Sequence, residues 1–187
     1  MAINYPEGTQ NLPSYATHFV YAQSNTIRNF SIGNGNYELD NTLQLNNVEI
    51  RNSTDVVMLD CRIYQMSTDN GEEYGYGWQY KDSNGNWQVI TQNNTNGLDN
   101  GSRMGVVHCT HHDYWNHGNP THSWGIAWKP GFANNAQDIR PCIRGNGNTG
   151  STIYLNAFAS GYSDGADWNR RSSSYCSATV YTTDGVN

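Results

Sequence analysis

The sequence predicts an all-β protein. Apolar and aromatic residues alternate with polar ones over short stretches, which is the period of a half-buried strand. Gly, Asn, Ser and Thr interrupt these stretches, and residues that favour helices are scarce. The 13 Tyr and 6 Trp supply large side chains for a core. A chain of 187 residues is long enough for one domain built in this way.

The first 15 residues differ from the rest of the chain. They contain Pro6, Gly8 and Pro13 among polar residues and show no periodicity. Proline removes a backbone donor, so such a segment is typical of extended chain outside the core. We therefore expect an N-terminal attachment arm over residues 1–15 and a β-sandwich head domain over residues 16–187.

Alternation in the head domain starts at residues 18–21. Between residues 37 and 45 the apolar residues on one face are Tyr37, Leu39, Leu43 and Leu45. The phase then changes at Asn46–Asn47, because Val48 and Ile50 continue it one residue out of step. A β-bulge or a tight turn at Asn46–Asn47 would explain the change.

Residues 55–66 form the clearest strand of the chain. The positions expected to face the core are Val57, Leu59, Cys61 and Ile63. Residues 74–80 and 87–91 follow as two strands that the turn residues DSNGN separate. Alternating aromatics on both sides of such a turn predict a β-hairpin.

Further strands are expected in the second half of the chain. They cover residues 106–109, 123–129, 138–144, 151–158 and 175–182, and polar loops lie at 92–102, 110–122 and 159–174. Nine or ten short strands at this spacing are typical of a sandwich or barrel. The architecture that we expect is a jelly-roll-like β-sandwich.

The cysteine positions favour free thiols over disulfides. Cys61, Cys109 and Cys176 are in phase with apolar residues of their strands, so we expect them to be small buried side chains. Cys142 is in phase with two arginines and is expected to face the opposite way. Two disulfides remain the alternative. The sequence contains no CxxC pair, so a zinc ribbon is not indicated.

Charge and hydropathy exclude several function classes. The net charge of −6 with only two Lys argues against a nucleic-acid partner bound through phosphates. The apolar runs are too short to cross a bilayer, so we expect no membrane insertion. The first ten residues show neither the basic nor the apolar region of a secretory signal, and we expect none.

Both ends of the chain resemble a known group of proteins. The opening MAINYPEGTQNLP and the closing GSTIYLNAFASGYSDGADWNRRSSSYCSATVYTT are similar to the ends of virion-associated proteins of marine phages, especially those that infect cyanobacteria. In that group a polar loop with a W/Y-x-R element precedes the final strand, and Trp168, Asn169 and Arg170 match it. The middle of the chain is similar only in the rhythm of its strands.

The resemblance implies a phage virion structural protein. Such a protein is a surface-exposed, trimeric β-sandwich that serves as a fibre or knob head or as a capsid decoration. Its partners would be two further copies of itself and other virion proteins, contacted through the N-terminal arm. The implied location is the virion, after synthesis in the cytoplasm of the host bacterium.

Several aromatic and arginine residues are candidates for a subunit interface. Tyr74, Tyr76, Trp78 and Tyr80 share one face of the strand at residues 74–80. Such a row suits a sandwich core or an interface between subunits, and less well a platform for sugars. Arg144 and Arg170 are candidates because arginine outnumbers lysine eight to two, and arginine forms fixed bidentate ion pairs.

Histidines are dense between residues 108 and 122. Imidazole is an ordinary zinc ligand, and His111, His112 and His117 are the candidates for a metal site, which a three-fold axis could assemble. Their spacing fits no recognised metal motif, and the interpretation that we favour is a polar loop that uses His as a donor and acceptor. We expect no cofactor.

A carbohydrate-binding module is the alternative function. Tyr114, Trp115, Tyr162 and Trp168 lie in the two long loops, where aromatic rings on a rigid β scaffold suit recognition of a host-surface glycan or receptor. The one match to the GxSxG motif, GYSDG at residues 161–165, lies in the predicted polar loop at 159–174 rather than between a strand and a helix, and no nucleotide-binding glycine loop precedes a helix. We therefore expect that the protein is not an enzyme and has no catalytic residue.

Overall fold

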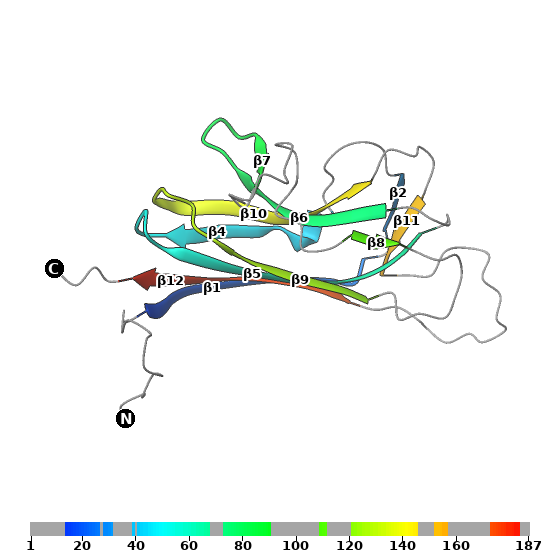
Figure 1. The fold of residues 1–187 in the computed structure, drawn as a ribbon, viewed down its shortest axis with the longest axis horizontal. Helices are drawn as coiled ribbons and strands as arrows, with labels where there is room; N and C mark the ends of the chain where they lie inside the picture. The colour runs from blue at the N-terminus through cyan, green and yellow to red at the C-terminus, as the bar shows by residue number, and fades with distance from the viewer. Residues whose placement is uncertain are drawn as a thin grey trace, which may run out of the picture.

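The protein is a β-sandwich of two antiparallel sheets, seen edge-on in Figure 1. The structure, a computed structural model, describes residues 14–26, 28–31, 39, 41–67, 73–90, 109–111, 121–145, 152–156 and 173–183. Strands dominate these residues, and a short 3-10 helix, η1 (Asn41–Leu43), precedes β4. The predicted all-β class is confirmed.

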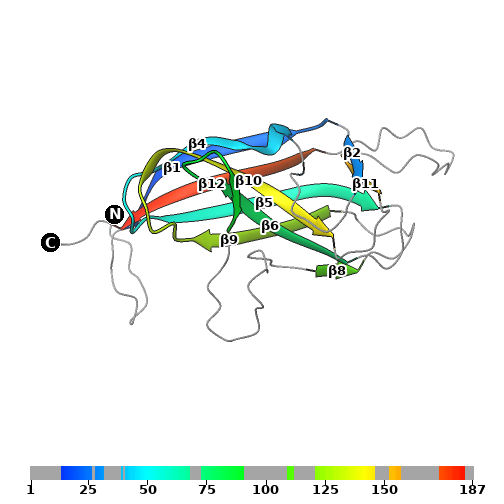
Figure 2. The ribbon, with the colours of Figure 1, turned by 90° about the horizontal axis from the view of Figure 1, so that it is seen from above.

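The first sheet contains six strands. Its central path runs from β1 (Ser14–Ser24) through β12 (Ser174–Thr183) to β5 (Val56–Ser67), and β9 (Thr121–Trp128) pairs with the other edge of β5. Beyond the end of β12, β5 continues with β11 (Thr152–Leu155), which pairs with β2 (Arg28–Ser31). Figure 2 shows β1, β12, β5 and β9 running along the long axis of the molecule.

The second sheet contains five strands. Its path runs from β4 (Leu45–Ile50) through β10 (Asn134–Gly145) and β6 (Glu73–Lys81) to β7 (Trp87–Val89). The short strand β8 (Cys109–His111) pairs with the first residues of β6. The turn between β6 and β7 confirms the predicted hairpin, and the side chain of Asp82 accepts the backbone N–H groups of Asn84 and Asn86 there.

The pairing order is that of a jelly roll. The first and last long strands pair (β1 with β12), then the next inward (β4 with β10), then β5 with β9, and finally β6 with β7 and β8. Contacts of β12 with β5 and of β10 with β6 join these nested pairs into two sheets. This is one long ribbon of strand pairs wrapped over itself, as the predicted jelly-roll-like sandwich requires.

The core lies between the two sheets. Val57, Leu59, Cys61 and Ile63 are all buried, as the alternation of β5 predicts. From the facing sheet, Tyr76 and Trp78 pack against Trp124 with ring centroids 5.0 and 6.3 Å apart. Aromatic rings at such distances add to the stabilisation that burial of their area provides.

The bulge predicted at Asn46–Asn47 is present. Leu45 pairs with Ile139 and Val48 pairs with Gln137, so β4 contains one more residue than β10 between these two pairs. Asn47 takes a φ of 57° there, a left-handed conformation that Asn adopts more easily than most residues. The extra residue moves Val48 and Ile50 onto the core side, where both are fully buried.

Some predicted boundaries were wrong by a few residues. Ser14 and Tyr15, placed in the arm, pair with Thr183 and Thr182 at the start of β1, and residues 1–13 lie outside the described part of the chain. The predicted loop at 110–122 was too long at both ends, because β8 runs to His111 and β9 begins at Thr121. Backbone pairing across β6 and β5 extends these strands beyond their apolar residues.

Candidate functional site

The outer face of the first sheet carries exposed rings. Phe19 is 63% exposed, Tyr21 50%, Met58 37% and Tyr175 36%, and these are the exposed large hydrophobic residues among those described. They alternate with the buried residues of β1, β5 and β12 and therefore point away from the core. We call this surface the aromatic face and include in it the outward residues of β9.

The strand register arranges the aromatic face in rows. From β1 across β12 and β5 to β9 the rows are Phe19–Thr179–Met58–Ala127, Tyr21–Ser177–Asp60–Gly125 and Gln23–Tyr175–Arg62–Ser123. In each row the residue on β1 is large and the residue on β9 is small. Tyr21 and Tyr175 lie in adjacent rows with their rings stacked, at a centroid distance of 6.1 Å and 28° between planes.

Two charged residues lie within these rows. Asp60 and Arg62 are both exposed on β5 and are of opposite sign. The carboxylate of Asp60 lies beside Gly125, so close that a side chain at residue 125 would meet it. The aromatic face therefore combines rings, small residues and one acid with one base.

The outer face of the second sheet is polar instead. Lys81 and Asp138 form an ion pair at 3.7 Å across β6 and β10. The guanidinium of Arg140 lies 3.9 Å from the ring centroid of Trp87, and its Nε donates to Oε1 of Gln79 at 2.9 Å. A cation over an indole ring is a favourable arrangement. Here the polar groups find partners within the same chain.

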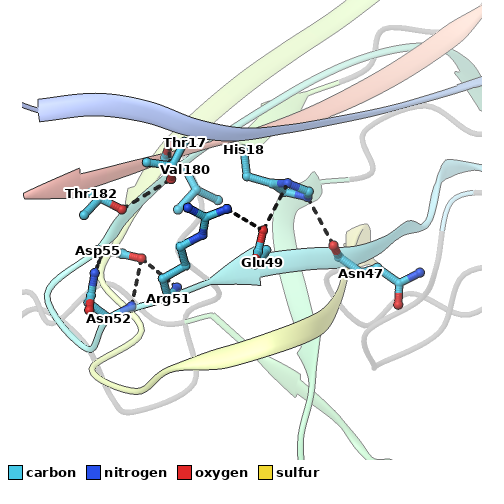
Figure 3. Close-up of polar contacts among 9 residues, drawn as sticks. All are labelled: Thr17, His18, Asn47, Glu49, Arg51, Asn52, Asp55, Val180 and Thr182. Carbon is cyan, nitrogen blue, oxygen red and sulfur yellow. Dashed lines mark hydrogen bonds and ion pairs between the residues drawn. The ribbon is translucent and has the colours of Figure 1, made fainter.

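A polar cluster joins the edges of the two sheets, where β1 lies beside β4 (Figure 3). Nε2 of His18 lies 3.1 Å from the backbone oxygen of Asn47, and Nδ1 lies 3.9 Å from Oε2 of Glu49. The same oxygen of Glu49 accepts from Nη2 of Arg51 at 3.1 Å. This hydrogen bond holds the pKa of Glu49 below its ordinary value.

The loop between β4 and β5 is organised by one buried carboxylate. Oδ2 of Asp55 accepts the backbone N–H of Arg51 at 2.8 Å and that of Asn52 at 3.0 Å (Figure 3). Oδ1 accepts from Nδ2 of Asn52 at 3.4 Å, and the backbone N–H of Asp55 donates to the carbonyl of Asn52 at 3.1 Å. Asp55 is fully buried, so these bonds replace the water that it loses.

The aromatic strand at residues 74–80 belongs mainly to the core. Tyr76 and Trp78, predicted as core or interface residues, are 1% and 0% exposed within a single chain, so they are not available to a second subunit. Tyr80 is partly buried and packs against Trp128 and Phe132, at centroid distances of 5.2 and 5.9 Å. Of the two alternatives, burial favours the core for these residues.

The remaining predicted site residues are placed only in part. In the backbone pairing, Tyr74 lies opposite Thr110, Arg144 opposite Gly75 and His111 opposite Glu73. The predicted residues that fall outside the described part of the chain are His112, Tyr114, Trp115, His117, Tyr162, Trp168 and Arg170. Among the residues that the structure does describe, no group of three or more His, Cys, Asp or Glu is arranged to hold a metal ion.

The described thiols follow the predicted phases, and the burial of Cys142 is a feature that its phase did not predict. Cys61 and Cys176 are free and buried in the core, as predicted, and Sγ of Cys176 donates to the backbone oxygen of Leu43 at 2.9 Å. Cys142 does lie on the side of β10 opposite to the core, yet it is fully buried. Gly77 and Gln79, its neighbours on β6, are buried as well, so this part of the outer face is covered. Burial raises the pKa of Cys142 and of Cys176 to about 12.

The aromatic face was not among the predicted sites. Its signal was present in β1, where Phe19 and Tyr21 alternate with Val20 and Ala22. Alternation predicts two faces, but when both faces carry apolar residues it does not say which one is covered. The partners of β1 decide this, and they come from the other end of the chain.

No protein-family model matches the chain, and no curated protein is similar to it. In the part of the chain that is described, no helix has the length and apolar character needed to cross a membrane.

Proposed function

We propose that this protein is a phage virion structural protein, a surface-exposed and trimeric β-sandwich that serves as a fibre or knob head or as a capsid decoration. The observation that carries the proposal is the aromatic face, which presents Phe19, Tyr21, Met58 and Tyr175 to solvent on an otherwise well-packed domain. A contiguous exposed apolar surface is typical of a protein that assembles with others. The jelly roll is common in viral capsid proteins and in lectins, which supports the proposal as an analogy of fold.

In this proposal the two ends of the domain have different roles. Residues 1–15 form the attachment arm, of which Ser14 and Tyr15 already belong to β1. β1 begins next to the end of β12, at one end of the long axis of the sandwich. An arm at one end docks onto a larger virion component and lets the sandwich project from the particle.

Removal of residues 2–13 tests this role, because it leaves every residue of β1 in place. We expect the shortened protein to fold with the stability of the full chain and to be lost from purified particles. The readout is the amount of protein per particle by quantitative mass spectrometry, with Ala136→Arg on the exposed part of β10 as a full-length control. Undiminished incorporation of the shortened protein would contradict the proposal.

A carbohydrate-binding module remains the second candidate, and the stacked pair of Tyr21 and Tyr175 favours it. Tyrosine rings offer an apolar surface to sugars, and Gln23 and Arg62 beside them offer polar groups. A screen against a glycan array and against polysaccharide from the host surface tests it. Binding that is lost in Tyr175→Ala would support this candidate, and an array without any binder would count against it.

A further inference from the structure

We propose that the aromatic face is a contact surface between copies of this chain, in which the β1–β12 half of one copy covers the β5–β9 half of another. This inference rests on the proposed role as an assembling subunit and names the surface through which assembly takes place. It goes beyond the interface candidates of the sequence, because Tyr76 and Trp78 lie in the core.

The composition of the aromatic face suits a protein partner. Interface cores are enriched in aromatic residues, Met and Arg. The described outward positions on β1, β12, β5 and β9 include Phe19, Tyr21, Tyr175, Met58 and Arg62. Phe19 and Met58 have no hydrogen-bonding group that would make them specific for sugar hydroxyls, so a protein surface explains them better than a glycan does.

The shape of the face complements a second copy of itself. Large residues on β1 (Phe19, Tyr21 and Gln23) lie in the same rows as small residues on β9 (Ala127, Gly125 and Ser123). If β1 of one copy lies over β9 of the other, each large residue of β1 meets a small residue of β9. If β1 lies over β1, rings meet rings and the small residues leave a gap. Close packing therefore favours the first arrangement.

The charges of the face permit self-association. The chain carries a net charge of −6, so the acidic parts of its surface would repel those of a second copy. The described rows of the face contain one acid and one base, Asp60 and Arg62, and are neutral together. With β1 over β9, the row that contains Arg62 places it opposite Tyr175 of the other copy, where a guanidinium can stack on the ring.

The symmetry of the assembly depends on whether the two halves of one aromatic face contact the same copy or two different copies. When both halves engage the same copy, the result is a closed dimer with a two-fold axis along the strands. When the two halves engage different copies, repetition of the contact closes into a ring, such as a trimer. Both assemblies bring β1 against β9, so the same residues carry the contact in either case.

Cross-linking tests the alignment directly. Gln23 on β1 and Ser123 on β9 are exposed and lie in the same row, three strand spacings or about 14 Å apart within one chain. With β1 of one copy over β9 of another, they face each other across stacked sheets at about 10 Å, which is too far for a disulfide but within reach of a short bismaleimide. Gln23→Cys protein mixed with Ser123→Cys protein should therefore give a cross-linked dimer with this reagent. Gln23→Cys mixed with Ser83→Cys, in the exposed β6–β7 turn, should not.

Solution mass with matched variants gives the second test. By light scattering behind a sizing column, the wild type should show two or three times 20.9 kDa. Ala127→Arg on the aromatic face should weaken association at least ten-fold, whereas Ala136→Arg, an exposed alanine on the other sheet, should leave it unchanged. Both variants should unfold at the temperature of the wild type when diluted to monomers, because both sites are exposed in one chain.

A wild type that stays monomeric at high concentration, or equal association of the two arginine variants, would overturn the inference. Monomeric protein that binds a glycan through Phe19 and Tyr175 would do the same in favour of the second candidate function. Incorporation into particles is measured separately with the arm deletion. An assembling protein that never enters particles would contradict the proposed function and leave the interface standing.

Discussion

The carboxylate of Asp55 shows how one side chain fixes the loop that connects the two sheets. It is the acceptor for two backbone N–H groups of the β4–β5 loop, at 2.8 and 3.0 Å. Asp55→Ala would leave these donors unpaired, and we expect a loss of about 2 kcal/mol in the free energy of unfolding. Asp55→Asn, which retains one acceptor oxygen, should lie between alanine and the wild type.

Urea denaturation measures the Asp55 series, with Ser53→Ala as the control. Ser53 is exposed in the same loop, so its replacement should change stability by less than about 0.5 kcal/mol. If Asp55→Ala is as stable as Ser53→Ala, the hydrogen bonds of Asp55 are not what holds the loop.

Glu49 gives a pH dependence with a definite sign. Its pKa is depressed in the folded state, first by the hydrogen bond from Arg51 and also by the charges of Arg51 and His18. A depressed carboxyl contributes stability that is present above its ordinary pKa and is lost as the pH falls through the depressed value. The wild type should therefore be more stable than Glu49→Gln at pH 7, and the two should converge as the pH falls through the depressed pKa of Glu49.

Thermal unfolding of both proteins across this pH range, at low salt, measures the effect of Glu49. Added salt should reduce the difference at pH 7, because the group is exposed and its interactions are screened. A difference between the two proteins that does not change with pH would assign the effect to packing rather than to charge.

At the scale of strands, Asn156 joins the ends of four of them. It follows β11 with a φ of 57° and is fully buried. Its Nδ2 donates to the carbonyl of Thr26 at 2.9 Å, and its Oδ1 accepts from Oγ of Ser174 at 2.6 Å. Oγ of Ser174 in turn accepts the backbone N–H of Tyr64 at 3.1 Å, so β1, β5, β11 and β12 meet at this junction.

A comparison of Asn156 with Asn47 separates the two roles of asparagine. Both residues have a φ of 57°, but Asn47 is exposed and its contacts to Asp138 and His18 use its backbone. Asn47→Gly keeps those contacts and should change stability by less than about 0.5 kcal/mol. Asn156→Gly removes buried hydrogen bonds, and we expect a loss of about 2 kcal/mol in urea denaturation. Equal effects at the two sites would show that backbone conformation alone matters.

The order of the strands was less predictable than their existence. Alternation placed Val57, Leu59, Cys61 and Ile63 correctly, and a change of phase located the bulge at Asn47. Both signals are local, and they depend only on the two-residue period of a strand. The burial of Cys142 could not be read in the same way, because it depends on what covers the outer face of β6 and β10.

The aromatic face could not be predicted from the sequence for a related reason. The predicted aromatic strand has its rings in the core, while the exposed rings lie on β1, β5 and β12. These three strands come from the start, the middle and the end of the chain, and only the jelly-roll pairing places them side by side. A surface that three distant segments build has no local pattern.

For the whole molecule, the two outer faces differ in character. The second sheet presents an ion pair and a stacked arginine that are partnered within the chain. The first sheet presents exposed rings, of which Tyr21 and Tyr175 stack on each other, beside the small residues of β9. If the proposed contact forms, it buries the outer face of the first sheet and leaves the outer face of the second outside the contact.

The buried cysteines report on the stability of the whole sandwich. Cys61 and Cys176 lie in β5 and β12 of the first sheet, and Cys142 lies in β10 of the second. Burial raises the pKa of Cys142 and Cys176 to about 12, so at pH 8 only roughly one thiol in ten thousand would be a thiolate even if reagent could enter. The thiolate is the reactive form, so we expect all three to resist iodoacetamide in the native protein.

Peptide mass spectrometry after timed labelling at pH 8 measures each site separately, with unfolded protein in urea as the fully reactive control. If the three thiols react at one common slow rate, the two sheets open together as a single cooperative unit. Faster labelling of Cys142 than of Cys61 and Cys176 would contradict this, and would show that the cover over the outer face of β10 opens while the core stays closed. The sandwich would then have a stable interior and a less stable layer over its second sheet.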